Sequence, residues 1–205
     1  MPHPSDARIV PLPKPRHTGV MSLETALCER RSVREYSRDP ISLSDVSQLL
    51  WAAQGITHTD GGRTAPSAGA LYPLEIYVLA GHVTGLGGGL YRYRIGRHDL
   101  VEMSREDLRG PLAEAALSQP QVEAAAAVIA VAGVVERTAA KYGRRALPYV
   151  HMEVGCVAQS IHLQAAALRL GTVFIGAFRD KQVKRLLGMP ASETPLALFP
   201  VGRLG

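Results

Sequence analysis

The sequence has little cysteine, few aromatic residues and no long hydrophobic run. Its 205 residues include only two cysteines, Cys28 and Cys156, and neither belongs to a Cys-x-x-Cys pair or a mixed Cys/His spacing. This excludes a disulfide framework or a zinc motif and predicts two reduced core thiols. The longest apolar run, residues 124–135, is too short to span a bilayer, and the N-terminus lacks the apolar stretch of a signal peptide. The sequence therefore predicts a cytoplasmic protein without a membrane partner.

The charge is moderately basic and is not concentrated in a long tract. The chain has 23 Lys and Arg against 18 Asp and Glu, a net charge of +5, and a pI of about 9.5. A nucleic-acid binder with salt-dependent affinity is one interpretation of this pI. However, the basic residues form short clusters, and only 5% of all residues are aromatic. Because stacking platforms for bases are scarce, we expect no nucleic-acid partner and favour a pocket for a small phosphate group.

The chain divides into a proline-rich arm and one domain. Residues 1–19 carry five prolines, which exclude a helix and predict an extended arm. Residues 20–205 are long enough for a single domain with one core. The helices expected in it lie at 23–29, 43–54, 104–117 and 149–170, and a further helix ends near 187–188. Ser42 is expected to cap the second of these helices and Gly55 to end it, and Gly171 is expected to close the helix at 149–170. The strands expected lie at 74–80, 90–94, 100–103, 127–135 and 196–202.

Residues 127–135 are continuously apolar and β-branched, as in a strand that helices cover on both faces. We therefore expect this strand at the centre of the sheet. Mixed helices and strands in this order indicate an α+β layer fold.

The strongest local signal is the segment Glu29–Tyr36, ERRSVREY, at a predicted helix-to-loop junction. Arg30, Arg31, Ser32 and Arg34 place guanidinium groups and a hydroxyl close together. Guanidinium forks suit a phosphate group. The spacing alone leaves open a second interpretation, a solvated cluster of charges.

Two further segments have chemical content. Small residues and Gly69 in the loop Ala65–Pro73, APSAGALYP, would let the backbone approach a flat ligand closely, although the motif by itself is also an ordinary turn. Lys141 and Tyr142 offer a base and a hydroxyl donor, and Arg144 and Arg145 nearby favour the neutral amine that a base needs. Taken by itself, however, the pair is more commonly a surface lysine beside a half-buried tyrosine.

Other features are expected to carry no site. Residues 87–89 form a triple glycine, but no Gly-Lys-Ser/Thr follows, so this is not a phosphate loop. His151 and His162 would lie about 16 Å apart along a helix, too far for one metal ion. Trp51 is expected in the core. Glu153 and Gln159 are expected to face either a pocket or a subunit interface.

Taken together, these segments resemble the nitroreductase superfamily, and the form of the 65–73 loop is similar to its SagB-type branch. The resemblance runs from Leu23 to Arg203 and includes GGGLYRYRIGRHDL, the segment from Lys141 through TVFIGAF, and FPVGR. It implies a nitroreductase-like fold, a central mixed β-sheet sandwiched by helices, with FMN at a homodimer interface. Residues implied to contact FMN are Arg30, Arg31, Ser32, Arg34 and Arg203 at the phosphate, and Pro66, Ser67, Ala68, Gly69, Gly176 and Ala177 along the ring.

The resemblance also implies an activity, the oxidation of thiazoline or oxazoline rings with hydride transfer to FMN. Lys141 and Tyr142 stand where azoline-oxidising members have a catalytic Lys-Tyr pair. The substrate would be a small molecule or a peptide, and a cyclodehydratase is the partner enzyme implied, although such members often carry more N-terminal sequence than this arm. Two alternatives stay open, an NAD(P)H-dependent nitro, quinone or flavin reductase and a non-catalytic flavin-binding protein.

Overall fold

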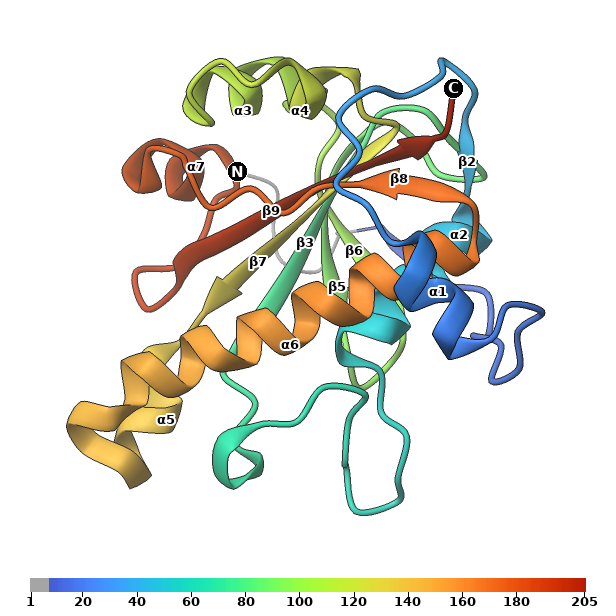
Figure 1. Ribbon diagram of the computed structural model, residues 1–205. Coiled ribbons are helices and arrows are strands. Elements are labelled where there is room, and N and C mark those ends of the chain that lie inside the picture. The colour runs from blue at the N-terminus through green and yellow to red at the C-terminus, as the bar shows by residue number, and fades with distance from the viewer. Residues whose placement is uncertain (1–7) are drawn as a thin grey trace.

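The computed structural model describes residues 8–205, and most of the proline-rich arm therefore falls within it. A seven-stranded sheet in the order β1-β6-β5-β3-β7-β9-β8 runs through the molecule (Figure 1). All pairings between its neighbouring strands are antiparallel, so the central sheet is not mixed as expected, and the parallel pair of β2 and β4 stands apart from it. The strands are β1 (Ile9–Pro11), β2 (Ile41–Ser42), β3 (Leu74–Ala80), β4 (Val83–Thr84), β5 (Gly89–Arg94), β6 (Asp99–Ser104), β7 (Ala127–Gly133), β8 (Leu170–Thr172) and β9 (Thr194–Arg203).

Helices cover both faces of this sheet, which confirms the nitroreductase-like α+β fold. One core cluster joins the sheet to α2 and α6, and a second joins it to α3, α4 and α7. Figure 1 shows α6 crossing the sheet, with α5 at its N-terminal end and α1 at its C-terminal end. The helices are α1 (Leu23–Glu29), α2 (Leu43–Gln54), α3 (Arg109–Ala115), α4 (Pro120–Ala124), α5 (Val135–Tyr142), α6 (Ala146–Ala167) and α7 (Asp180–Leu186), with short 3₁₀ turns η1 (Ala68–Ala70) and η2 (Gly143–Arg145).

Several elements follow local chemistry that the sequence shows directly. Helix α1 has the predicted bounds, and Ser22 caps it by accepting the Thr25 N–H. Helix α2 begins after Ser42, whose hydroxyl accepts the Asp45 N–H while the Asp45 carboxylate accepts the Ser42 N–H. This reciprocal capping box satisfies two backbone donors. Strand β3 also has its predicted bounds.

Other boundaries were predicted wrongly. No helix begins at Ser104, because this residue ends β6, and α3 starts only at Arg109. Helix α6 begins three residues earlier than expected and ends at Ala167, since Arg169 takes the left-handed φ of +57° that Gly171 was expected to supply. Gly171 instead lies in β8, where a Cβ would lie 2.6 Å from Val33 Cγ1. Close packing rather than helix termination therefore requires this glycine.

Three expectations about the central strand, the cysteines and Trp51 also need correction. Strand β7 is buried at all seven residues as predicted, but β3 is the middle strand of the sheet. Cys28 is exposed and Cys156 is only half-buried, so neither is a core thiol. Trp51 is half-buried under residues of the arm, where His17 stacks on it with ring centroids 5.3 Å apart.

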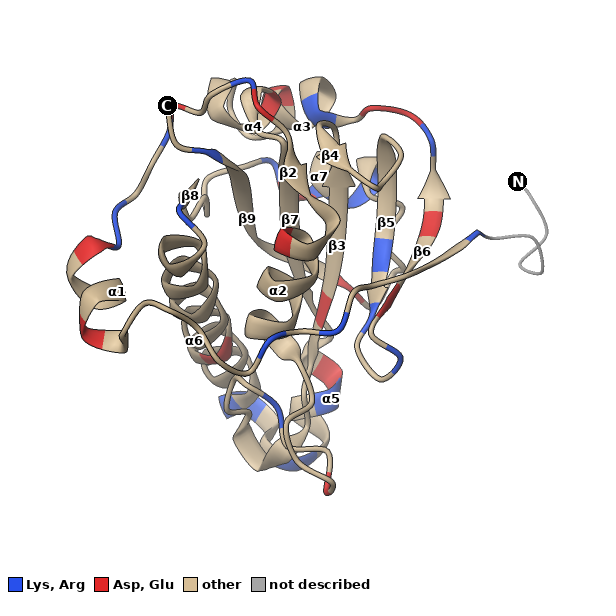
Figure 2. Ribbon diagram, turned by 90° about the vertical axis from the view of Figure 1, so that its right-hand side faces the viewer, with Lys and Arg blue, Asp and Glu red and all other residues tan. Residues whose placement is uncertain are grey.

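The described part of the arm lies on its own chain. Strand β1 pairs with the edge strand β6, and the backbone of Arg16 exchanges hydrogen bonds with the Gln48 side chain of α2. Charged residues are scattered along the ribbon without a long tract of one sign (Figure 2). None of the helices within residues 8–205 is both long and apolar enough to cross a membrane. The division at residue 19 remains a prediction.

Candidate active site

The arginine-rich segment lies between α1, β8 and the C-terminal half of α6. Arg30 ends α1, and its N–H donates to the Ala26 carbonyl. Arg31 Nη1 donates to the carbonyl oxygens of Cys28 at 2.7 Å and Arg30 at 2.8 Å. The Val33 N–H donates to the Thr172 carbonyl at 2.9 Å and attaches the segment to β8. Two backbone hydrogen bonds therefore orient the Arg31 side chain, although Arg31, Ser32 and Arg34 are all exposed.

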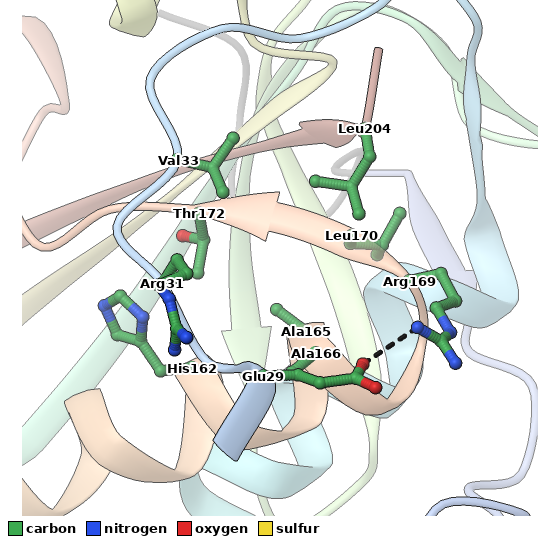
Figure 3. A pocket seen from close by; sticks show the side chains of 10 residues that line it. All are labelled: Glu29, Arg31, Val33, His162, Ala165, Ala166, Arg169, Leu170, Thr172 and Leu204. Atoms are coloured by element: carbon green, nitrogen blue, oxygen red, sulfur yellow. Dashed lines mark hydrogen bonds and ion pairs between the residues drawn. The ribbon is translucent and has the colours of Figure 1, made fainter. Parts of the chain in front are cut away.

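A cavity of about 170 Å³ opens beside Arg31 (Figure 3). The Glu29–Arg169 ion pair, 2.8 Å long, forms part of its lining. Two polar side chains in the lining are buried, His162 at 7% exposed and Thr172 at 2%. Burial, together with the charge of Arg30, lowers the pKa of His162, so its imidazole is neutral near pH 7.

Arg31 makes the cavity suited to a small anionic group such as a phosphate, because its guanidinium retains N–H donors beyond its two backbone contacts. His162 Nδ1 and Thr172 Oγ1 find no hydrogen-bond partner among residues 8–205. Buried polar atoms are normally paired, and leaving one unpaired costs about 1–3 kcal/mol. Both atoms have less than 1 Å² of accessible surface, however, so neither faces the open space of the cavity.

Arg203 lies apart from this lining. It ends β9 opposite Leu170, and its Nη2 contacts Asp45 Oδ2 at 3.1 Å. Its Nε also donates to the Pro40 carbonyl at 3.5 Å. Much of its donor capacity is therefore used within the chain, and its phosphate contact remains a prediction.

The loop 65–73 meets the Lys-Tyr pair at the opposite end of α6. Gly69 has a φ of +64°, and a Cβ there would lie 2.9 Å from Tyr142 Oη and 3.1 Å from Lys141 Nζ. The Tyr142 ring packs edge-on against Tyr149 of α6, with centroids 5.1 Å apart. Lys141 Nζ lies 5.5 Å from the Tyr142 ring centroid. Two segments 72 residues apart in sequence, from Gly69 to Lys141, thus share one surface.

A ring of polar contacts holds this loop against α2 and α6. The Arg63 N–H donates to Tyr72 Oη at 3.3 Å, and the Tyr72 N–H donates to Ser67 Oγ at 2.9 Å. The Ser67 hydroxyl lies close enough to the Glu153 carboxylate to affect its pKa. Gln54 Nε2 donates to Glu153 Oε1 at 3.4 Å, and Arg63 Nη1 donates to Gln54 Oε1 at 2.7 Å, which closes the ring.

Burial strongly affects the charged members of this ring. It raises the pKa of Glu153, because desolvation outweighs the opposing hydrogen bonds from Ser67 and Gln54 and the charge of Arg63. It also lowers the pKa of Arg63. Glu153 and Cys156 line a second cavity of about 320 Å³ together with Pro66, Ser67 and Ala68. Of the two residues left open in the sequence analysis, Glu153 faces a cavity and Gln159 is exposed.

The two cavities lie at different positions along α6. Glu153 lines one and His162 lines the other, and nine residues of helix separate them by about 14 Å. One chain therefore does not bring the arginine cluster and the 65–73 loop into a single cavity.

The predicted ring contacts Gly176 and Ala177 follow β8 and are exposed. Nearby, Phe174 is 43% exposed and packs edge-on against Phe199, with centroids 5.4 Å apart. Phe199 also packs against the His162 ring at 6.4 Å. The 174–177 segment is thus connected to the arginine-side cavity through Phe199.

Sequence reasoning missed the polar side chains that only the fold assembles. His162 was considered only as a metal ligand, and Thr172, Arg63 and Gln54 were not singled out. His162 lies on a helix face shared with apolar residues, where no local signal distinguishes it. Within residues 8–205 no group of three His, Cys, Asp or Glu is placed to hold a metal ion.

Comparisons with known proteins agree with this architecture. Residues 27–203 match the Nitroreductase family. A nitroreductase-family protein of Methanocaldococcus jannaschii is 47% identical over 183 residues, which cover 89% of this chain and 91% of the relative. A crystal structure of a nitroreductase-family protein from Ralstonia eutropha JMP134 has a TM-score of 0.84 at 28% identity, covering 97% of this chain and 90% of the other.

The fold is also similar to a chain of the E. coli microcin synthetase McbBCD complex. The TM-score is 0.71 at 20% identity, covering 94% of this chain and 77% of the other. At this identity the likeness concerns the fold alone. On the family match and the 47% identical relative, this chain belongs to the nitroreductase family of oxidoreductases.

Proposed function

We propose that this protein is an FMN-dependent dehydrogenase that oxidises a thiazoline, an oxazoline or a related ring. The observation that carries the proposal is the contact between the Lys141–Tyr142 pair and the Gly69 loop. A base and a hydroxyl donor thereby stand at a loop of small residues that a flat ring can approach.

The proposed cofactor contacts form two groups. At the phosphate end we place Arg30, Arg31, Ser32, Arg34 and Arg203. Along the ring we place the 66–69 segment together with Gly176 and Ala177. The cavity beside Arg31 supports an anionic group at the first of these positions.

Lys141 and Tyr142 would handle the substrate's proton. When bound, FMN supplies the acceptor for the hydride that leaves the substrate ring. Lys141 Nζ takes the proton lost from the neighbouring ring carbon, so that one proton and one hydride leave together and the ring becomes aromatic. Tyr142 Oη donates a hydrogen bond that orients the substrate. Because Lys141 is exposed, it can reach a substrate that lies over Gly69.

A homodimer would unite the two separated parts of the site. Helix α6 exposes Leu147 at 49% and Met152 at 60%, and a Cβ on Gly155 would meet nothing within 4 Å. Met152 also lines the cavity next to Ser67. If two copies pack α6 antiparallel, the arginine end of one helix lies beside the Ser67 end of the other. We further propose that the substrate is a small molecule or a peptide and that a cyclodehydratase is the partner enzyme.

A second candidate function is the reduction of nitro compounds, quinones or flavins by a nicotinamide donor. It is favoured by the 47% identical relative, whose name places it among the nitroreductases. Both functions share the cofactor site and differ in their need for the Lys141 amine. A flavin-binding protein without turnover is a third outcome of the same experiment.

The first test is an absorption spectrum of the purified protein, with identification of the cofactor released on denaturation.

The second test compares Lys141→Ala with Lys181→Ala, an exposed control on α7. We expect Lys141→Ala to lower azoline oxidation by about 100-fold or more, as for loss of a general base, while nitro reduction is retained. Equal azoline oxidation in both variants would contradict the dehydrogenase proposal. Bound FMN without turnover of any substrate would leave only the binding protein.

A further inference from the structure

Three basic side chains follow one another where α5 leads into α6. Lys141 lies in the last turn of α5, Arg144 and Arg145 belong to η2, and all three residues are exposed. None of them forms an ion pair with a carboxylate within residues 8–205. Figure 1 shows α5 and the start of α6 beyond the ends of the strands. Water solvates most such charges, so their surroundings decide whether they bind a ligand.

The carboxylates near this turn do not balance its positive charge. Glu75 is already paired with Arg137. Glu136 is exposed, but it lies five residues before Lys141 and therefore about 140° around α5. Glu153 is 4% exposed, and burial raises its pKa, so that it holds its proton more readily. The basic residues of this turn therefore outnumber its ionised carboxylates, and the field here favours an anion.

Arg145 adjoins the cavity that the 65–73 loop lines. Its guanidinium carbon lies over the Tyr149 ring, 5.2 Å from the centroid. Tyr149 lines the cavity of about 320 Å³ together with Ser67, and its ring packs against the Tyr142 ring. A guanidinium that lies over an aromatic ring keeps its N–H donors along its edge. The stacking contact therefore holds a cation beside the proposed substrate position and leaves its donors available.

The size and chemistry of this place favour a small carboxylate. A volume of about 320 Å³ lies at the lower end of the range of roughly 300–1,000 Å³ for small-molecule sites. Guanidinium groups match carboxylates with two parallel hydrogen bonds. A thiazoline or oxazoline made from cysteine, serine or threonine bears the carbonyl carbon of that residue on its ring. Inside a peptide this carbon belongs to a neutral amide, whereas in a small molecule it can be a carboxylate.

We propose that the substrate is a small ring compound with a free carboxylate, and that Arg145, together with Arg144, binds this carboxylate. The inference rests on the proposed function and selects the small molecule over a ring inside a peptide. The two arginines bind and orient the substrate, and Lys141 stays available for the ring proton. Selection by charge needs only that the substrate lies at this cavity, so it can be measured without turnover.

The experiment compares a phenyl-substituted thiazoline carboxylate with its primary amide, which has the same ring and no charge. Oxidation of each compound is measured with the purified protein and FMN. Binding is measured separately, by calorimetric titration of the corresponding aromatic thiazole carboxylate and amide. The double variant Arg144→Gln/Arg145→Gln removes both charges, and Arg145→Lys retains the charge without the planar fork. Arg97→Gln is the control, because it removes an exposed arginine between β5 and β6.

We expect wild-type protein to prefer the carboxylate over the amide by on the order of 10-fold in kcat/KM, mainly through KM, as for hydrogen bonds to a charged group. The double variant should lose this preference, Arg145→Lys should keep part of it, and Arg97→Gln should keep all of it. Turnover of the amide should be almost the same in every variant. A merely structural role of the arginines would instead lower the turnover of both compounds.

The same preference in wild type and in the double variant, or an equal loss for both compounds, would overturn the inference. If neither thiazoline is oxidised, the dehydrogenase proposal fails, and the titrations decide the inference by themselves. Tighter binding of the thiazole carboxylate that depends on Arg144 and Arg145 supports it. Equal binding of the two thiazoles, or binding of neither, overturns it.

Discussion

Gly69 allows a left-handed backbone at the point where the loop touches the Lys-Tyr pair. An alanine there would adopt the φ of +64° at a cost of about 1–2 kcal/mol, and its Cβ would also displace Tyr142 Oη and Lys141 Nζ. Gly61 is a matched position, with a φ of +88° and nothing within 4 Å of a Cβ. Substitutions at these two glycines therefore distinguish the effect of backbone strain from the effect of contact with the Lys-Tyr pair.

We predict that Gly69→Ala and Gly61→Ala lower the melting temperature by similar amounts, because both variants carry the same kind of backbone strain. Only Gly69→Ala should also reduce the Lys141-dependent oxidation, since only its methyl group moves the pair. Calorimetry and azoline turnover measure the two effects. Equal turnover in the two variants would show that the contact with Gly69 has no role.

Glu153 predicts a pH dependence of stability. Its pKa is raised in the folded protein, so the folded state holds this proton more tightly than the unfolded state does. The stabilisation from Glu153 is therefore complete below its ordinary pKa of about 4.5 and is lost as the pH rises through the folded value. Glutamine cannot ionise, and it retains the oxygen that accepts from Gln54.

We expect Glu153→Gln to flatten the decline in the free energy of unfolding above pH 4.5. Urea denaturation of both proteins at a series of pH values measures this difference. Met152→Leu, at the adjacent exposed residue, removes no ionisable group and should keep the wild-type profile. Parallel profiles for wild type and Glu153→Gln would exclude Glu153 as the source of the pH dependence.

At the scale of elements, α2 connects the capping box at its start with the ring of polar contacts at its end. Ser42 and Asp45 satisfy donors of the first turn, and Gln54 in the last turn binds Glu153. Asp45 also pairs with Arg203 of β9. The start of α2 is thus coupled to the end of the sheet.

We predict that Ser42→Ala lowers the free energy of unfolding by about 1 kcal/mol, as for loss of an N-cap hydroxyl. Ser44→Ala, within the first turn, is the control because its side chain is exposed and the capping hydrogen bonds do not involve it. Chemical denaturation measures both variants. A loss of the same size in Ser44→Ala would show that the cap has no special effect.

At the scale of the whole molecule, the proposed site depends on a second copy. Met152 is 60% exposed on α6, whereas Met103 is 39% exposed on β6, next to the edge strand β1. A lysine at position 152 would place a charge in the proposed interface, and one at position 103 would stay in solvent.

We expect Met152→Lys to shift the protein toward monomer and to weaken FMN binding, because the two halves of the site then separate. Met103→Lys should retain the mass and the FMN affinity of wild type. Light scattering after size-exclusion chromatography measures the mass, and flavin titration measures the affinity. A monomeric wild-type protein that binds FMN tightly would contradict the dimer proposal.

The sequence by itself determined the elements whose signals are local. Ser42 with Asp45 specified the start of α2, and the fully apolar run from Ala127 specified a buried strand, because capping and hydrophobic patterning act over a few residues. The motifs at Arg30, Gly69 and Lys141 were likewise visible in the chain and indicated the family. The start of α3 and the end of α6 were not visible in the chain, because Ser104 and Arg169 adopt conformations that sheet pairing and packing impose.

Only the tertiary structure decided which polar groups meet. The ring through Arg63, Gln54 and Glu153 joins residues up to 99 positions apart, and the cavity beside Arg31 brings in His162 and Thr172 from α6 and β8. No periodicity or spacing identifies these partners, because hydrogen bonds over such separations form only when the sheet and helices have packed. The same packing places the two cavities on one helix about 14 Å apart, and this separation is the physical reason to expect a second copy of the chain.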